Sequence, residues 1–243
     1  MLDSSLKVIN LKKSFGDKVV LDNINLEIKK NEIFGLIGLN GAGKTTFIKI
    51  ILDLLNADDG SIEILNESSL KTESRKKLRY LPEKFQVSSM LKGMEFLKIF
   101  NDFAKETKVD KKQLKNEILN LTDLLALDRK ALSLKVSKYS KGMMQKLGLI
   151  STFLGDSQLV ILDEPMSGLD PKARICLKEL LLQSKAENKS IFFSSHILAD
   201  IDEICDRIAI LNNGKISFIG TPEELKKKYS QSSLEKAFLK EIE

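Results

Sequence analysis

The stretch that decides the fold is IFGLIGLNGAGKTTF, residues 33–47. Its first five residues form an unbroken apolar run, which is typical of a strand buried on both faces of a parallel sheet. A glycine cluster follows, and the apolar run TFIKIILDLL (residues 46–55) then indicates a helix. The stretch therefore predicts a buried strand, a tight glycine loop and a helix in direct succession.

The glycine loop, residues 38–46, reads GLNGAGKTT and fits the pattern G-x-x-x-x-G-K-[ST]. Glycines let the backbone wrap closely around phosphates, and the following helix adds the positive end of its dipole. In this pattern Lys44 reaches the β- and γ-phosphates and the Thr45 hydroxyl binds Mg²⁺. A dinucleotide-binding loop would need G-x-G-x-x-G, but from Gly41 the sequence reads GAGKTT. We therefore expect a nucleoside triphosphate on this P-loop, with these binding residues: Gly38, Leu39, Asn40, Gly41, Ala42, Gly43, Lys44, Thr45 and Thr46.

Three further apolar runs resemble the strand at residues 33–37: LVILD (159–163), SIFFS (190–194) and RIAIL (207–211). Helical patterns separate most of them, which is the alternation of a doubly wound α/β fold. Residues 1–30 instead alternate polar and apolar side chains, which indicates half-buried antiparallel strands. The core is therefore expected to combine a mostly parallel sheet with an antiparallel N-terminal part.

Between residues 86 and 138 the composition shifts to Leu, Lys and Glu, with no strand-like run. Asp110 is typical of a helix start, and one apolar stripe follows it: Leu114, Ile118, Leu121 and Leu125. We interpret the chain as one domain, residues 1–243, of α/β class with a P-loop NTPase core. Residues 1–85 and 139–243 would form this core with its N-terminal antiparallel β subdomain, and 86–138 would be an inserted helical subdomain.

The composition suits a globular protein, with 42% hydrophobic and 30% charged residues. The 39 basic side chains exceed the 34 acidic ones by only 39 − 34 = 5, and the chain has three Tyr and no Trp. A nucleic-acid surface would need clustered charge and aromatic residues, so we expect no nucleic-acid partner. Cys176 and Cys205 form no CxxC pair and are expected to be free thiols. No apolar stretch is long enough to span a bilayer, so we expect a cytoplasmic location.

Two carboxylates follow the run LVILD directly. Asp163 ends the predicted strand and Glu164 comes next. Asp163 can hold Mg²⁺ through water, and Glu164 can orient or deprotonate an attacking water. A few residues later Asp170 precedes Pro171, which is typical of a helix N-cap followed by proline at the first helical position.

His196, the one histidine of the chain, lies in IFFSSHILAD, residues 191–200. Its position after a predicted strand leaves two interpretations open. It can be a satisfied histidine at a junction between strand and helix, or it can be one of the few histidines that titrate usefully or bind a ligand.

Taken together, these motifs resemble the ATP-binding subunit of an ABC transporter over nearly the whole chain. The P-loop, LVILDEP and SGLD resemble the Walker A, Walker B and D-loop motifs of that family, with Asp170 in the D-loop. Phe15 in KSFGD resembles the aromatic residue that stacks on adenine. His196 resembles the family's switch histidine, which implies contact with the γ-phosphate and positioning of Glu164.

The segment YSKGMMQKL, residues 139–147, is similar to the family signature LSGGQ. Ser140, Lys141, Gly142 and Met143 occupy its second to fifth positions. In the family this segment faces the γ-phosphate that the other subunit holds, so the resemblance implies two subunits, identical or different, around two nucleotides. From the sequence alone, Ser140 is also a good N-cap for the helix that follows.

Two departures from the family pattern bear on the chemistry. Lys141 and Met143 replace the Gly and Gln of the signature, and we expect the segment to remain competent. In RYLPEKF, Glu83 stands where the family usually has a glutamine that contacts Mg²⁺. A carboxylate is also a good ligand for Mg²⁺ or its water.

The resemblance implies an ATPase that powers transport of an unidentified substrate through separate multi-span membrane subunits, on the cytoplasmic face of the membrane. LPE and LKGMEFL most resemble the subfamily that drives export. An ABC-type ATPase acting on ribosomes or DNA, and a nucleotide-sensing module without hydrolysis, are the alternatives. A groove for the membrane subunit would expose these apolar side chains: Phe85, Val87, Met90 and Leu91.

Overall fold

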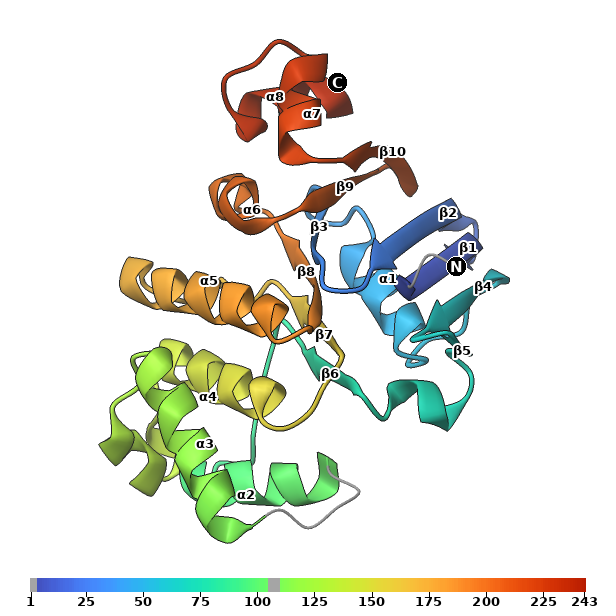
Figure 1. Ribbon diagram of the computed structural model, residues 1–243. Helices are drawn as coiled ribbons and strands as arrows, with labels where there is room; N and C mark the ends of the chain where they lie inside the picture. Colours follow the sequence, from blue (N-terminus) through green and yellow to red (C-terminus); the bar gives the residue numbers. More distant parts are fainter. Residues whose placement is uncertain (1–3, 105–109) are drawn as a thin grey trace.

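The computed structural model describes residues 4–104 and 110–243 (Figure 1). Within these ranges one sheet has four strands, all antiparallel, in the order β2-β1-β4-β5. The alternating residues near the N-terminus form its two long strands, so that prediction is confirmed. The strands are β1 (Ser4–Phe15), β2 (Lys18–Lys29), β4 (Asp59–Ile64) and β5 (Glu67–Ser68).

The second sheet of the described chain has six strands in the order β10-β9-β3-β8-β7-β6. All neighbouring pairs from β9 to β6 are parallel, and β10 is antiparallel to β9. The four predicted apolar runs are β3, β7, β8 and β9, which confirms the mostly parallel core. The strands are β3 (Ile33–Ile37), β6 (Leu78–Leu81), β7 (Leu159–Asp163), β8 (Ser190–Ser195), β9 (Arg207–Asn212) and β10 (Lys215–Gly220).

Parallel pairing brings the carboxyl ends of β3, β7 and β8 to one edge of this sheet. The register sets Ile37 beside Ser195 and Asp163 beside Ser194. The chain leaves β3 into the glycine loop, β7 into Glu164 and β8 into His196. Three motifs far apart in sequence therefore meet at one place, as ligand sites in open α/β sheets do.

Helices cover the six-stranded sheet and extend below it in the view of Figure 1. The predicted N-caps are present: the side chains of Asp110, Ser140 and Asp170 each accept a backbone N–H of the helix that follows. The helices are α1 (Lys44–Ile51), α2 (Gly93–Ala104), α3 (Lys111–Leu124), α4 (Lys141–Phe153), α5 (Pro171–Ala186), α6 (Leu198–Ile204), α7 (Pro222–Lys228) and α8 (Leu234–Ile242). Short 3₁₀ helices span Thr72–Arg75, Arg129–Ser133 and Val136–Lys138.

The helical region contains α2 and α3, and both pack against α4. On the predicted stripe of α3, Leu114, Ile118 and the following Leu125 are buried. Helix α4 also packs against β6. The subdomain predicted for residues 86–138 therefore shares its packing with a helix outside that range, and its boundaries stay a prediction.

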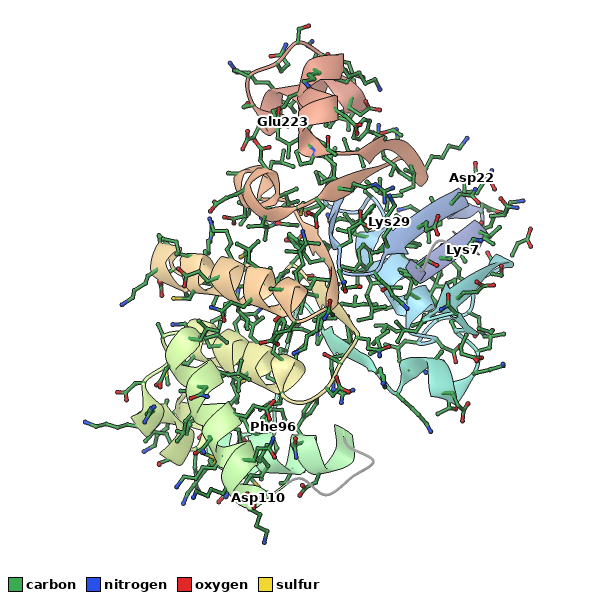
Figure 2. All side chains as sticks on the ribbon, viewed as in Figure 1. Lys7, Asp22, Lys29, Phe96, Asp110 and Glu223 are labelled. Carbon is green, nitrogen blue, oxygen red and sulfur yellow. The ribbon has the colours of Figure 1, made fainter. Side chains whose placement is uncertain are left out.

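A glycine lets α4 approach the sheet. A Cβ atom on Gly148 would lie 2.7 Å from Leu81 Cδ1 and 2.8 Å from the ring of Phe85. The Phe85 ring also meets Phe96 of α2, labelled in Figure 2, at a centroid distance of 5.8 Å. Phe85 thus joins the end of the sheet to α2 and α4.

The expected exposure of four apolar side chains is wrong for three of them. Met90 is 80% exposed. Phe85, Val87 and Leu91 are only partly exposed, and the first two pack against the large hydrophobic core. The reason for Phe85 is that its ring packs against α2 and α4, whereas Met90, just before α2, has no such cover.

Among the helices of residues 4–104 and 110–243, none is both long and apolar enough to cross a bilayer. Cys176 and Cys205 are free thiols, as predicted. Burial raises the pKa of the Cys205 thiol well above its usual value, with Asp206 and Glu32 adding to the shift. This thiol therefore stays protonated at neutral pH.

Candidate functional site

The glycine loop between β3 and α1 has a backbone that its sequence explains. Gly41 and Gly43 have φ angles of +83° and +108°, which side chains rarely tolerate. A Cβ atom on Gly38 would lie 2.6 Å from the carbonyl oxygen of Leu211 in β9. The loop can therefore curl tightly and pack on the neighbouring strand only because these residues are glycine.

Lys44 opens α1 and turns its side chain back into the loop. Its ammonium donates to the carbonyl oxygens of Gly38 (2.7 Å) and Leu39 (3.3 Å) and lies 3.7 Å from Glu164 Oε1. The residue is only 7% exposed. A buried cation at a helix N-terminus, inside a ring of backbone groups, is a binding place for an anion.

A pocket of about 530 Å³ opens beside this lysine. Six of the nine predicted loop residues line it, and Gly38, Leu39 and Ala42 do not. Glu83, Glu164 and His196 reach it from other elements, as the sequence suggested. Its lining is Lys18, Val20, Asn40, Gly41, Gly43, Lys44, Thr45, Thr46, Glu83, Glu164, Ser167 and His196.

Thr45 lines the pocket and contacts Asp163, which is not part of the lining. The Thr45 hydroxyl donates to Asp163 Oδ2 at 2.9 Å, and Asp163 is only 1% exposed. Hydroxyl and carboxylate oxygens are ligands that Mg²⁺ accepts, directly or through its water. Burial raises the pKa of Tyr80 to about 12, and the carboxylates of Asp163 and Glu83 add to the shift. Asp163 and Glu83 are therefore both close enough to the Tyr80 phenol to affect its ionisation. The Thr45 hydroxyl and the Asp163 carboxylate together fit a magnesium site.

Glu164 follows in a strained conformation with a φ angle of +50°. Its backbone N–H donates to Ser194 Oγ at 3.0 Å. Its Oε2 atom lies 2.7 Å from Nδ1 of His196, whose side chain is 56% exposed. The side chain of Glu164 is 11% exposed, and its carboxylate lies at the pocket wall between a lysine and an imidazole.

The structure does not bring Phe15 into the pocket lining. Its ring, at the end of β1, is 51% exposed, and the ammonium of Lys13 lies 5.3 Å from the ring centre. Lys18 and Val20 of β2 line the pocket instead. Sequence reasoning missed both residues, because nothing in their spacing marks which part of the hairpin reaches the loop.

The signature residues also lie outside this pocket, at the start of α4. The Ser140 hydroxyl accepts the backbone N–H of Met143 at 3.2 Å, which confirms its capping role. A Cβ atom on Gly168 would lie 3.0 Å from Cε of Lys141, so the lysine stem covers the loop that leads to Asp170. The signature segment is thus packed on the D-loop, whose Asp170 caps α5.

The arrangement can bind a chain of phosphates and act on a water molecule. Lys44 and the loop amides offer positive charge, Thr45 and Asp163 offer oxygen ligands for a divalent cation, and Glu164 is a carboxylate that can accept a proton. One further group at the site, Ser194, was not predicted. Its position opposite Asp163 in two adjacent parallel strands is the signal that could have found it.

Comparison with known proteins agrees with this geometry. Residues 21–167 match the family model described as ABC transporter. A solved ATP-binding subunit of an ABC transporter is 30% identical, with a TM-score of 0.89 over 98% of this chain and 99% of that one. An uncharacterized ABC transporter ATP-binding protein of Synechocystis sp. is 38% identical over 84% of this chain and 57% of its own length.

The Nod factor export ATP-binding protein I of Sinorhizobium fredii is 33% identical over 92% of this chain. The match covers 64% of that protein, so this chain spans about three fifths of the length of the two curated relatives. The family match extends over more than half of the chain and includes the P-loop, the signature segment and both carboxylates. The chain is therefore a member of the ABC transporter family.

Proposed function

We propose that this protein is the ATP-binding and ATP-hydrolysing subunit of a transporter. It would power movement of a substrate through separate multi-span membrane subunits, on the cytoplasmic face of the membrane. The observation that carries the proposal is the meeting of Lys44, Glu164 and His196 around one pocket. The relative named for Nod factor export supports export as the direction.

In this proposal each group at the pocket has one task. Lys44 and the loop amides bind the β- and γ-phosphates of ATP, and Thr45 and Asp163 hold Mg²⁺, with Glu83 at the same pocket. Mg²⁺ supplies positive charge that offsets the charge of the phosphates. Glu164 takes the proton of the attacking water, and His196 fixes the orientation of Glu164 and contacts the γ-phosphate.

A second ATPase subunit, identical or different, would complete the site. Ser140 and its neighbours form an exposed helix start away from the chain's own pocket, where they can face a nucleotide held by another copy. Lys141 adds a positive charge to that surface. Phe15, exposed at the end of β1, would stack its ring on adenine.

The contact with the membrane subunit would use the segment that joins β6 to α2. Glu83 at one end of this segment lines the nucleotide pocket, and Met90 near its other end is 80% exposed. A change at the pocket can therefore be passed along eight residues to a surface methionine. We propose that a short cytoplasmic helix of the membrane subunit packs on that surface.

The test is co-purification from detergent-solubilised membranes, with a matched control. Met90→Glu should abolish retention of a multi-span membrane protein. Leu70→Glu should retain it, because Leu70 is equally exposed (77%) but lies beyond the other end of β6, outside that segment. Both variants should bind ATP as the native protein does. Phe85 is unsuitable for this test because its ring packs on Phe96.

If the native protein stays wholly soluble and sediments with ribosomes or nucleic acid, the transport proposal is wrong. The protein would then be an ABC-type ATPase that acts on ribosomes or DNA. Equal retention of the membrane protein by both variants would instead move the contact surface away from Met90.

A further inference from the structure

Ser194 lies near the end of β8, beside Asp163 and Glu164 at the end of β7. It is the penultimate residue of β8, is fully buried, and stands opposite Asp163 in the register of the sheet. Its hydroxyl donates to Asp163 Oδ1 at 2.6 Å and accepts the backbone N–H of Glu164 at 3.0 Å. One hydroxyl has a proton to give and lone pairs to receive, so both bonds can exist together.

The bond to Asp163 determines how this carboxylate presents its oxygens. Oδ1 is held by Ser194, and Oδ2 is left to face the hydroxyl of Thr45. Because Asp163 is only 1% exposed, bulk water cannot take the place of the Ser194 hydroxyl at Oδ1. Without the hydroxyl, Oδ1 would lose its partner and the carboxylate would be free to rotate away from Thr45.

The bond to Glu164 holds a strained backbone. A φ angle of +50° is unfavourable for a residue with a Cβ atom, so surrounding contacts must maintain it. Two contacts do so: Ser194 Oγ accepts the N–H of Glu164, and the N–H of Ser167 donates to the carbonyl of Glu164 at 3.0 Å. In this backbone conformation the side chain of Glu164 contacts His196.

We infer that Ser194 is a positioning residue that sets the metal-holding carboxylate and the catalytic base with one hydroxyl. The inference rests on the proposed function, because hydrolysis gives Asp163 and Glu164 their separate roles. Ser194 touches neither nucleotide nor water in this scheme. It acts through the two carboxylate residues, and its loss should affect Mg²⁺ binding and turnover but not the contacts of the glycine loop.

The experiment measures ADP affinity by calorimetry on the full chain, with Mg²⁺ and with EDTA. The ratio of the two affinities reports what the metal adds. Ser194→Ala should keep the metal-free affinity within about twofold, because Lys44 and the loop amides are unchanged. It should lower the ratio by about tenfold or more, the scale on which outer partners of metal ligands act. Its kcat for ATP should fall on the same scale.

Ser190→Ala is the matched control. Ser190 lies on the same strand and is 1% exposed. Its hydroxyl bonds to Ser5 Oγ (2.7 Å) and to the backbone N–H of Asn31 (2.9 Å), away from the pocket. Both variants remove a buried hydroxyl, so both should lower the melting temperature, but Ser190→Ala should leave the Mg²⁺ ratio unchanged.

Ser194→Cys gives a second variant if the alanine protein folds poorly. A thiol is a weak donor and acceptor, so this variant should also have a lower ratio of ADP affinity with Mg²⁺ to ADP affinity with EDTA. A ratio and kcat within twofold of the native protein in either Ser194 variant overturns the inference and leaves the proposed function intact. An equal loss in Ser190→Ala also overturns it, since strand damage would then be the cause. A native protein that hydrolyses no ATP overturns both.

Discussion

His196 and Glu164 are joined side chain to side chain, with Nδ1 of the histidine 2.7 Å from Oε2 of the glutamate. The two residues follow adjacent parallel strands and are 32 positions apart in the chain. The imidazole remains 56% exposed while the carboxylate beside it is almost buried. A packed junction residue would be covered, so this relationship favours the functional interpretation of the histidine.

The first prediction concerns Glu164. Glu164→Gln keeps the size of the side chain but cannot accept a proton from water. It should still bind Mg-ATP and hydrolyse it at least ~100-fold more slowly, the usual scale for losing a general base. It should also accumulate as an ATP-bound dimer on size exclusion, because hydrolysis no longer opens it. Near-normal phosphate release would remove Glu164 from this role.

The second prediction concerns His196. His196→Ala should lower ATP turnover while ADP affinity and the melting temperature stay close to native. The reason is that a side chain with 56% exposure contributes little to packing, yet it touches the proposed base. Turnover and thermal unfolding are measured on one preparation. A lower melting temperature with full turnover of the folded fraction would show a purely structural histidine.

The sequence predicted the parts of the site that depend on local chemistry. Gly43 and Lys44 stand at fixed spacing because a phosphate loop needs them, and Asp163 could be placed because an apolar run marks its strand. Parallel pairing then brings the ends of those strands together whatever the loops between them do. The family resemblance added His196, which no spacing rule would have found.

Features that depend on tertiary packing could not be read in the same way. Strand β6 has four residues, too few to show a period, and no expected strand covered it. Ser194 resembles any other residue of a buried strand until the register places it opposite Asp163. Phe85 and Met90 are both large apolar residues of the same segment, so the sequence does not distinguish them. Only the packing of α2 and α4 determines which of them is covered.

The third prediction concerns the phenol of Tyr80, whose pKa burial raises to about 12. The raised pKa favours the neutral phenol in the folded protein. The contribution of the neutral Tyr80 phenol to the free energy of unfolding is therefore fully present below the ordinary pKa of 10. It is lost as the pH rises through about 12. A titration of absorbance at 295 nm should contain a component with that midpoint, which Tyr80→Phe removes. If Tyr80→Phe instead removes a component near pH 10, the burial of Tyr80 beside Asp163 and Glu83 is contradicted.

The last prediction concerns Gly148, which lets α4 lie against the end of β6. A methyl group there would come within 2.7 Å of Leu81 Cδ1 and 2.8 Å of the Phe85 ring, and both belong to the packed interior. Gly148→Ala should therefore cost about 1–3 kcal/mol of the free energy of unfolding, as overpacking does. Helix propensity acts in the opposite direction by at most about 1 kcal/mol, so the net change should be a loss.

A double-mutant cycle identifies the cause of that loss. Leu81→Ala alone should destabilise the protein by about 2–5 kcal/mol, because it opens a cavity. Added to Gly148→Ala it should cost less, since the new methyl group fills part of the space, and the two changes should couple favourably by at least about 0.5 kcal/mol in urea unfolding. Strictly additive losses would show that the methyl group does not meet Leu81. In that case α4 would not owe its close approach to the sheet to this glycine.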